Sequence, residues 1–392
     1  MFIVGIDIAK FTHVASIMDN SGNLIGKTFK FSNSSDGFNK LLENLNSCSN
    51  SPADFEIGME STGHYWLSLY THLFELGYNV HVINPVQSDA LRGLFIRQSK
   101  NDFKDSFIIA EVIRIGRYSE SVLADNDLFA LRDLTRQRFF LVDMISDLKR
   151  KVISLLDRVF PEYSSLFTDT FGATSLKLLE TYTTPEEILS VPTEDLFNFL
   201  STASKGRFKF DKAEQIQAVA KNTFGTLLGV DSCAFMLKQF VEQIQFLEKQ
   251  MKDLEVEISR RLAAFNSPIQ TITGIGEILG AVIISEIGDI NRFDSPDKLA
   301  AFAGIDPTVK QSGEFEGSKN KMSKRGSPYL RRAIWLASSV AVIYDPAIKA
   351  FYDKKRNQGK HHYTAIGAVC KKMCNIIFAV LKNNTPYVPA IS

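Results

Sequence analysis

Four acidic residues occupy positions at which a carboxylate needs an explanation. Asp7 ends a short apolar run at the N-terminus, and Glu60 directly follows a second apolar run. A charged side chain in an apolar strand is costly unless a partner compensates its charge. Asp102 and Asp105 stand three positions apart, so one face of a helix would present both. If the strands that end at Asp7 and Glu60 are neighbours, their carboxylates reach the same edge of a sheet.

Converging carboxylates predict a site for divalent metal ions. Like charges at short range repel one another unless cations lie between them. Oxygen ligands favour Mg²⁺, for which Mn²⁺ can substitute. Two such ions can activate a nucleophile and stabilise a leaving oxygen in phosphodiester chemistry. Taken alone, each acid could instead be a solvated surface residue, and this alternative is strongest for Asp102 and Asp105.

Ser312 is a candidate nucleophile in the second half of the chain. It lies in Gln311-Ser312-Gly313, and basic residues follow it closely. A serine among cations can attack a phosphodiester while the cations stabilise the developing charge. Ser-Gly is also a common loop pair, so these residues alone do not establish the role. The basic residues are predicted to contact nucleic-acid phosphates, with a solvated surface as the alternative: Lys319, Lys321, Lys324, Arg325, Arg331 and Arg332.

The distribution of charge also indicates a nucleic-acid partner. The 392 residues carry a formal net charge of only +1. From Lys310 to the C-terminus, however, 15 Lys and Arg stand against 4 Asp and Glu, which leaves −10 for the rest of the chain. Such asymmetry indicates a basic binding region joined to an acidic body.

The composition limits the class and compartment of the protein. With 45% hydrophobic and 23% charged residues it is globular, which excludes long disorder. Four cysteines are too few for a disulfide framework and indicate a reducing, cytoplasmic setting. No run approaches the ~20 apolar residues of a membrane span, and the N-terminus lacks the basic start of a signal peptide. We therefore expect no membrane association.

The elements that must position these residues fall into three predicted domains. Residues 1–120 alternate strands and helices, typical of a mixed sheet flanked by helices. The expected strands are 2–8, 12–18, 24–31, 55–59 and 79–83, and the expected helices are 36–45, 65–76 and 87–118.

Residues 121–266 are predicted to be a helical linker. Apolar residues repeat with heptad spacing over 131–159 and 237–258, which predicts a coiled coil. It could form between chains or as an antiparallel bundle within one chain. Residues 167–229 receive no role.

Residues 267–392 are predicted to be a mainly helical third domain. A glycine-containing turn precedes the helix 277–287, and Gly288-Asp289 separates that helix from another over 296–303. This order is typical of a helix-hairpin-helix that binds phosphate, with a plain helical corner as the alternative. The last helices are expected over 331–343 and 363–381.

Several histidines and cysteines admit more than one interpretation. Cys370 and Cys374 could form a zinc site with His361 and His362. Their apolar helix favours buried free thiols instead. His64 could act as a base or cap the following helix, and the sequence does not decide.

The motifs together resemble one known family. In the first half these are Gly-Ile-Asp-Ile-Ala-Lys, Met-Glu-Ser-Thr-Gly-His-Tyr-Trp and Lys-Asn-Asp-Phe-Lys-Asp. In the second half they include Thr-Gly-Ile-Gly, Gln-Ser-Gly and Ser-Lys-Arg-Gly-Ser-Pro-Tyr-Leu-Arg-Arg. In this order they resemble the DEDD transposases of the insertion-sequence one-ten family.

The resemblance implies a RuvC-like domain of RNase H fold, in which Asp7, Glu60, Asp102 and Asp105 bind Mg²⁺. It implies an oligomerising helical linker and a C-terminal transposase domain whose serine, Ser312, becomes covalently linked to DNA. It also implies a guide (bridge) RNA that pairs with donor and target DNA, and dimers to tetramers in a bacterial or archaeal nucleoid. The chain departs from the pattern at Ser106, where the family usually has alanine.

We interpret the chain as an RNA-guided DNA recombinase. One alternative is a Holliday-junction resolvase that uses only the acidic site and water. Another is a nucleic-acid-binding scaffold without catalysis. An actin-like sugar kinase would need a second glycine-rich phosphate loop, which the sequence does not contain.

Overall fold

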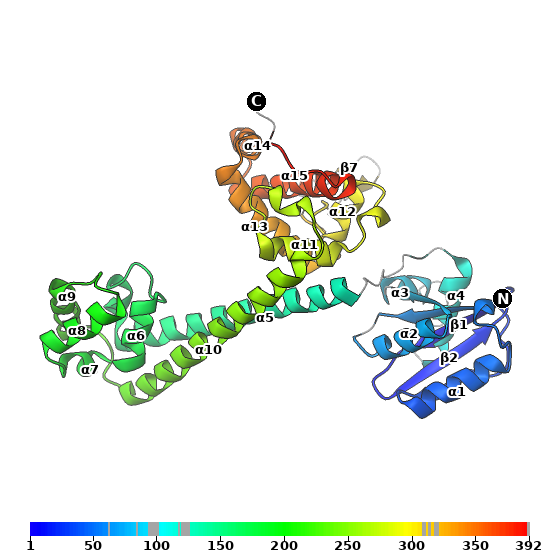
Figure 1. Cartoon of the computed structure of the whole chain (residues 1–392), viewed down its shortest axis with the longest axis horizontal. Coiled ribbons are helices and arrows are strands. Elements are labelled where there is room, and N and C mark those ends of the chain that lie inside the picture. Colours follow the sequence, from blue (N-terminus) through cyan, green and yellow to red (C-terminus); the bar gives the residue numbers. More distant parts are fainter. Residues whose placement is uncertain are drawn as a thin grey trace. The chain divides into compact units, whose positions relative to one another are not determined.

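The computed structural model divides the chain into two compact units, Met1–Leu123 and Ala124–Ser392 (Figure 1). It describes residues 1–61, 63–83, 85–92, 102–116, 118, 126–307, 311–312, 315–316 and 321–389. Within these ranges the side chains of residues 86, 87, 90, 92, 102, 103, 311, 312, 315 and 316 lie outside the description.

The first unit contains the predicted mixed sheet. Its strand order is β3-β2-β1-β4-β5. Strands β1 and β2 are antiparallel, as are β2 and β3, whereas β4 runs parallel to both β1 and β5. The bounds are β1 Phe2–Asp7, β2 Thr12–Met18, β3 Phe29–Ser32, β4 Phe55–Glu60 and β5 Asn79–Ile83. The carboxyl ends of β1 and β4 therefore lie at the same edge.

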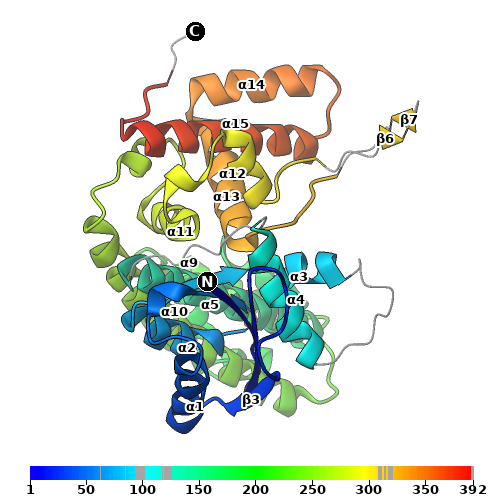
Figure 2. The ribbon, with the colours of Figure 1, turned by 90° about the vertical axis from the view of Figure 1, so that its right-hand side faces the viewer.

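Helices cover both faces of this sheet. Helices α1 (Ser35–Asn46) and α2 (Trp66–Glu75) pack on one face through leucines such as Leu41 and Leu73. Helix α4 (Asp102–Ile115) packs on the other face through Ile109 and Ile113. Figure 2 shows α4 on the opposite side of the sheet from α1. The short helices η1 (Pro52–Asp54) and α3 (Pro85–Arg92) complete the unit.

Two sequence predictions for this unit were wrong in their bounds. The third strand begins at Phe29 rather than at Leu24, which forms only an isolated bridge with Met18. Gly26 has a φ of +72°, a left-handed conformation that interrupts an extended strand. The helical segment predicted over 87–118 begins earlier, at Pro85 of α3, and ends earlier, at Ile115 of α4, while residues 93–101 lie outside the described residues.

Paired glycines bring α4 unusually close to the sheet. Gly5 of β1 and Gly58 of β4 are direct partners across the parallel pair. A Cβ atom on Gly5 would lie 2.0 Å from the Ser106 carbonyl oxygen and 2.3 Å from the Ala110 nitrogen. Only glycine leaves room for the helix backbone at this distance.

The second unit is built on two long helices, α5 (Asn126–Val159) and α10 (Val230–Ala263). Ion pairs join Arg138 to Glu255 and Lys149 to Glu248, so the residue numbers rise on one helix as they fall on the other. The helices therefore form an antiparallel pair within one chain. Association between chains through this region remains a prediction.

The segment between the long helices forms a helical subdomain at one end of the pair. Its own core includes Tyr163 and Leu196, and it packs on residues of α5 and α10 such as Leu156 and Leu237. The elements are η2 Pro161–Ser165, α6 Ala173–Thr181, α7 Pro185–Leu189, α8 Thr193–Ala203 and α9 Phe210–Lys221.

The C-terminal part of this unit is a helical bundle around α11 (Glu277–Ile287), whose residues from Gly280 onward are all buried. Helix α14 was not predicted, although Asp345 caps its N-terminus through the Ile348 amide and Pro346 follows at the first turn. The other elements are η3 Pro268–Thr271, η4 Ile290–Arg292, α12 Pro296–Phe302, β6 Gln311–Ser312, β7 Phe315–Glu316, α13 Pro328–Tyr344, α14 Pro346–Asn357 and α15 His362–Asn383.

Helix α15 is long and apolar enough to cross a membrane, as is the bent pair α13 and α14 when taken together. In the bundle, α15 buries Ile366, Met373 and Ile377 against the other helices. A core helix of this kind meets the same criteria of length and apolarity.

Candidate active site

Asp7 and Glu60 lie side by side at one edge of the sheet. The printed parallel register ends with Ile6 opposite Met59, so the next pair is Asp7 and Glu60. Successive strand residues point to opposite faces, which places both acids on the face that Gly5 and Gly58 present to α4. The predicted meeting of these two carboxylates at one edge thus follows from the register.

Helix α4 brings its own acids toward that edge. Near its C-terminus, Glu111 and Arg114 lie against Gly22, in the turn that follows Met18. Met18 pairs with Ile3 at the start of β1. The N-terminus of α4, with Asp102 and Asp105, therefore lies toward the carboxyl end of β1, and the Asp105 side chain is buried with 6% exposure.

Two serines support this group of acids. Ser88 of α3 is buried and donates a hydrogen bond to Glu60 Oε1. Ser106, the departure from the family pattern, is buried and shares a hydrogen bond of 2.8 Å with the Ser16 hydroxyl. Sequence reasoning did not identify Ser88, because its partner Glu60 lies 28 positions away.

The acids at this edge are the candidate metal ligands. Among side chains that the structure describes, no group of three or more His, Cys, Asp or Glu is arranged to hold an ion. The side chain of Asp102 is outside that description. The acids nevertheless offer only carboxylate oxygens at one edge, a donor set that suits Mg²⁺.

Ser312 lies in a small hairpin of the second unit. It ends β6 and pairs with Phe315 of the antiparallel strand β7. The sequence predicted a loop, and the structure places the serine at a strand end. Its side chain, Gly313 and Lys319 lie outside the described residues.

Residues 323–327 follow the hairpin and are called the basic turn, because they include Lys324 and Arg325. Backbone hydrogen bonds hold this turn against the segment that contains Phe302 and Gly304. The Lys324 amide donates to the Gly304 carbonyl at 3.1 Å, and the Ser327 amide donates to the Phe302 carbonyl at 2.9 Å. A Cβ on Gly326 would lie 2.1 Å from that Phe302 carbonyl oxygen. The side chains of Lys324 and Arg325 remain exposed, as does that of Lys321. Anchored backbone and exposed cations suit contacts with phosphates.

The two arginines of α13 have partners within the unit. Arg331 donates to the Ala303 carbonyl at 3.2 Å. Arg332 forms two hydrogen bonds of 2.9 and 2.8 Å with Asp143 of α5, and it lies over the Phe139 ring. These contacts attach α13 to its neighbours, so a role in nucleic-acid binding remains a prediction for both.

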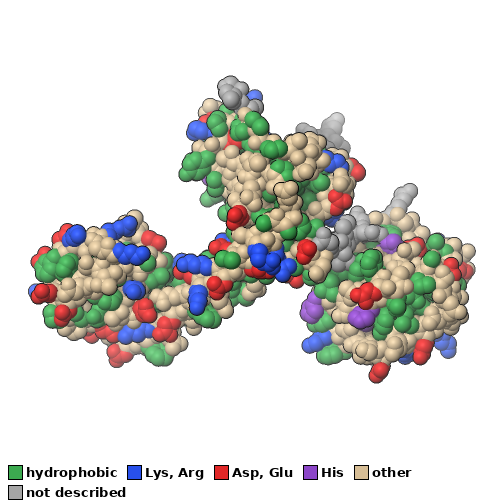
Figure 3. All heavy atoms as spheres, viewed as in Figure 1, with side chains coloured by type: hydrophobic (Ala, Val, Ile, Leu, Met, Phe, Trp, Pro, Cys, Tyr) green, Lys and Arg blue, Asp and Glu red, His purple; other side chains and the backbone are tan. Residues whose placement is uncertain are grey.

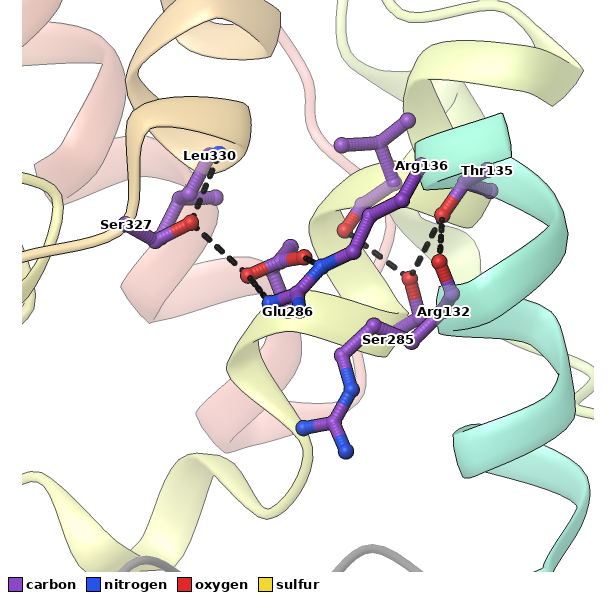
Figure 4. A network of polar contacts seen from close by, with 8 residues as sticks. Arg132, Thr135, Arg136, Ser285, Glu286, Ser327 and Leu330 are labelled. Atoms are coloured by element: carbon purple, nitrogen blue, oxygen red, sulfur yellow. Dashed lines mark hydrogen bonds and ion pairs between the residues drawn. The ribbon is translucent and has the colours of Figure 1, made fainter. Parts of the chain in front are cut away.

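A buried carboxylate missed by sequence reasoning connects the basic turn to α5. Glu286 accepts hydrogen bonds from Arg136 Nε at 2.6 Å, Arg136 Nη2 at 3.0 Å and Ser327 Oγ at 2.7 Å (Figure 4). Ser327 also caps α13 by accepting from the Leu330 amide. Although burial opposes it, the hydrogen bonds and charge of Glu286 raise the pKa of Arg136. An acid inside an apolar helix was the available signal, as the acid in an apolar strand was for Asp7.

The sequence also singled out two cysteines, a glycine-containing turn and His64, and the structure shows what surrounds each. Cys370 and Cys374 are buried in the bundle core. Gly274 of the predicted phosphate-binding turn lies against the Ala337 carbonyl, where a Cβ would come within 2.4 Å. His64 is exposed, with its ring 4.3 Å from that of Tyr65.

Along α5 and α10, Lys and Arg are interspersed with acids (Figure 3), as in the pair Arg150–Asp147.

Comparisons with known proteins agree with the motifs. A transposase model of the DEDD, IS110 type matches residues 4–161, and the model of the transposase IS116/IS110/IS902 family matches residues 266–353. The insertion element IS900 42 kDa protein of Mycobacterium paratuberculosis is 28% identical over 76% of this chain and 75% of its own length. The insertion element IS116 44.8 kDa protein of Streptomyces clavuligerus is 24% identical over 99% and 96%.

A third relative is the mini-circle putative transposase for IS117 of Streptomyces coelicolor, 26% identical over 92% of this chain and 89% of its own length. The matches extend over both units and follow the order of the quoted motifs. The chain therefore belongs to the IS110 family of insertion-sequence transposases.

Proposed function

We propose that this transposase cuts and exchanges DNA strands through a covalent bond between Ser312 and DNA, assisted by Mg²⁺ at the acidic site. The observation that carries the proposal is the register of β1 and β4, which sets Asp7 beside Glu60 on the face covered by α4. The strand order β3-β2-β1-β4-β5 supports an RNase H-like, RuvC-like first domain.

Asp7, Glu60, Asp102 and Asp105 would hold the metal. Bound there, Mg²⁺ would neutralise phosphate charge and stabilise a leaving oxygen. The chain's own contribution is positioning. Ser88 orients Glu60, and the close contact of α4 with Gly5 fixes Asp105 near the carboxyl end of β1.

In the covalent step, Ser312 Oγ forms a bond to phosphorus and gives up its proton. The bond from phosphorus to one deoxyribose oxygen breaks, and that oxygen takes up a proton. The phosphodiester energy is conserved in the serine–DNA bond, so a hydroxyl of another strand can reverse the step and join a new end. Lys321, Lys324 and Arg325, exposed close to the hairpin in sequence, are suited to hold the phosphates.

Family membership also suggests the partners. A bridge RNA would select donor and target DNA by base pairing. Dimers or tetramers would form along the helix pair, where the apolar side chains of Phe140 and Phe246 are 57% and 60% exposed. Large exposed apolar side chains on paired helices favour association.

Strand exchange by purified protein with guide RNA, donor and target DNA and Mg²⁺ tests the proposal. Ser312→Ala and Asp7→Ala should each abolish exchange, because one lacks the nucleophile and the other a metal ligand. Ser339→Ala, which removes a hydroxyl bonded only to the Trp335 carbonyl in the described structure, is the matched control. Full exchange by Ser312→Ala, with loss in Asp7→Ala, would instead favour a resolvase that uses water.

A further inference from the structure

Three arginines and one glutamate form a half-buried cluster in the second unit. Arg132 and Arg136 lie one turn apart on α5, Glu286 is in the last turn of α11, and Arg292 ends η4. Glu286 pairs with Arg136. Neither Arg132 nor Arg292 has an ion pair with a carboxylate in the part of the chain that the structure describes.

Aromatic rings hold the guanidinium groups of Arg132 and Arg292. Arg132 lies 5.0 Å from the Phe129 ring centroid. Arg292 lies 4.5 and 4.3 Å from the centroids of Phe293 and Phe302, and its Nε donates to the Ile287 carbonyl at 3.1 Å. Figure 4 shows the Arg132 guanidinium extending away from Glu286. Stacking fixes the plane of each cation and leaves N–H groups at its edge for an anion.

The surroundings of these cations are electrostatically unfavourable. Burial, followed by the charge of Arg136, lowers the pKa of Arg132, although the charges of Glu286 and Asp133 oppose this. Burial and the charge of Arg132 lower the pKa of Arg292, and the charges of Asp289 and Glu286 again oppose the shift. Arginine stays protonated in proteins, so the acids offset burial and the repulsion among the arginines only in part.

We propose that Arg132 and Arg292 together bind one phosphodiester group of a DNA strand. The forked donors of arginine match phosphate oxygens, and the negative charge of a phosphodiester would offset part of the positive charge of the cluster. Glu286 also accepts a hydrogen bond from Ser327, which ends the basic turn, so one buried carboxylate contacts both Arg136 of the arginine cluster and the turn. DNA as the source of the phosphate rests on the proposed function.

Thermal unfolding of the full chain with inorganic phosphate is the first test. At constant ionic strength, replacing chloride with phosphate should raise the Tm of the wild type. Arg132→Gln/Arg292→Gln should lose this rise, and in chloride its Tm should equal or exceed that of the wild type because repulsion is relieved. A merely structural role for the arginines predicts a lower Tm in chloride.

Binding to duplex DNA at several salt concentrations is the second test. The double variant should lower the slope of log K against log salt by about 1, the contribution of one phosphate. Arg158→Gln is the matched control, an exposed arginine on the same helix about 39 Å away at 1.5 Å per residue. It should keep both the phosphate response and the slope.

Each outcome decides the inference. The proposed anion site is overturned if phosphate does not raise the Tm of the wild type. It is also overturned if the double variant keeps the rise. A lost phosphate response with an unchanged DNA slope overturns DNA as its source. If the double variant does not fold, Arg132→Lys/Arg292→Lys replaces it. Lysine keeps the charge but lacks the forked N–H donors of arginine, so this variant should bind DNA more weakly and keep the slope of log K against log salt. Neither test depends on Ser312 chemistry, so Ser312→Ala should respond as the wild type does.

Discussion

At the scale of single residues, the buried carboxylate of Glu286 binds both Arg136 of α5 and Ser327 of the basic turn. The side chain of Glu286 is 2% exposed, whereas that of Arg136 is 40% exposed. In Glu286→Gln the Arg136 charge would lose its partner but could reach water. We therefore expect a loss of about 2 kcal/mol in the free energy of unfolding, below the value for a fully buried pair.

Urea unfolding monitored by circular dichroism measures this change. Glu257→Gln is the control, because Glu257 pairs with Arg260 and Arg261 on the surface of α10. Its midpoint should stay that of the wild type. Equal midpoints for both variants would remove the proposed role of Glu286 in joining α5, α11 and α13.

The cysteines give a second residue-scale prediction. Burial raises the pKa of Cys370 to about 11 and that of Cys374 to about 12. Both should remain thiols at pH 8 and resist alkylation in the folded protein, while the partly exposed Cys48 reacts. Because unfolded cysteines ionise near pH 9, these groups should stabilise the fold below pH 9 and progressively less as pH rises toward 12.

Mass spectrometry after timed alkylation checks the order of reaction. Rapid native labelling of Cys370 or Cys374 at pH 8 would contradict their burial in the bundle core. Labelling of all four cysteines in urea serves as the positive control.

At the scale of elements, the close contact between α4 and β1 should control both stability and geometry. Gly5→Ala places Cβ against the backbone of α4, which cannot move by itself, and should cost about 3 kcal/mol. Gly58→Ala meets the Ile113 side chain at 2.3 Å, which can rotate away, so its cost should be smaller. Calorimetric unfolding measures both.

Gly276→Ala is the control for stability, since nothing lies within 4 Å of the added Cβ. A Gly5→Ala variant as stable as Gly58→Ala would show that α4 does not pack on β1 as described. Because the displaced α4 carries Asp105, Gly5→Ala should also reduce strand exchange.

Sequence patterns predicted most elements but not the contacts that position them. Apolar runs identified the strands that end at Asp7 and Glu60, and heptad spacing identified both long helices. The start of β3 was missed because Gly26 lies within an otherwise strand-like run. That the helices pair within one chain depends on distant contacts such as Arg138 with Glu255, which periodicity cannot specify.

The candidate site was predictable to a similar extent. Asp7 and Glu60 could be expected at one edge, since each ends an apolar strand. Ser312 as nucleophile came from family resemblance, and the charge cluster of Arg132, Arg292 and Glu286 was not foreseen. Arg132 lies more than 150 positions before Glu286 and Arg292, and sequence patterns do not specify contacts over such a separation.

At the scale of the whole molecule, charge is divided unevenly along the chain. The basic excess after Lys310 predicts that the C-terminal part supplies much of the DNA affinity. Lys324→Gln/Arg325→Gln should reduce the salt slope of DNA binding by about 2, one unit for each lost phosphate contact. Fluorescence anisotropy with labelled duplex DNA measures the slope.

Lys354→Gln/Arg356→Gln makes the same charge change on α14, where both side chains are exposed. Its slope should change less if position, rather than total charge, sets the contact. Equal losses in the two double variants would mean that the basic turn has no special role.

The central claim is that Ser312 forms a covalent bond with DNA, and trapping that bond tests it most directly. Purified protein would be incubated with labelled DNA, guide RNA and Mg²⁺, then denatured in detergent and separated by electrophoresis. We predict a slowly migrating protein–DNA adduct whose linked peptide contains Ser312, absent in Ser312→Ala and retained in Ser339→Ala. Cleaved DNA without an adduct in the wild type, or an adduct that persists in Ser312→Ala, would contradict the claim.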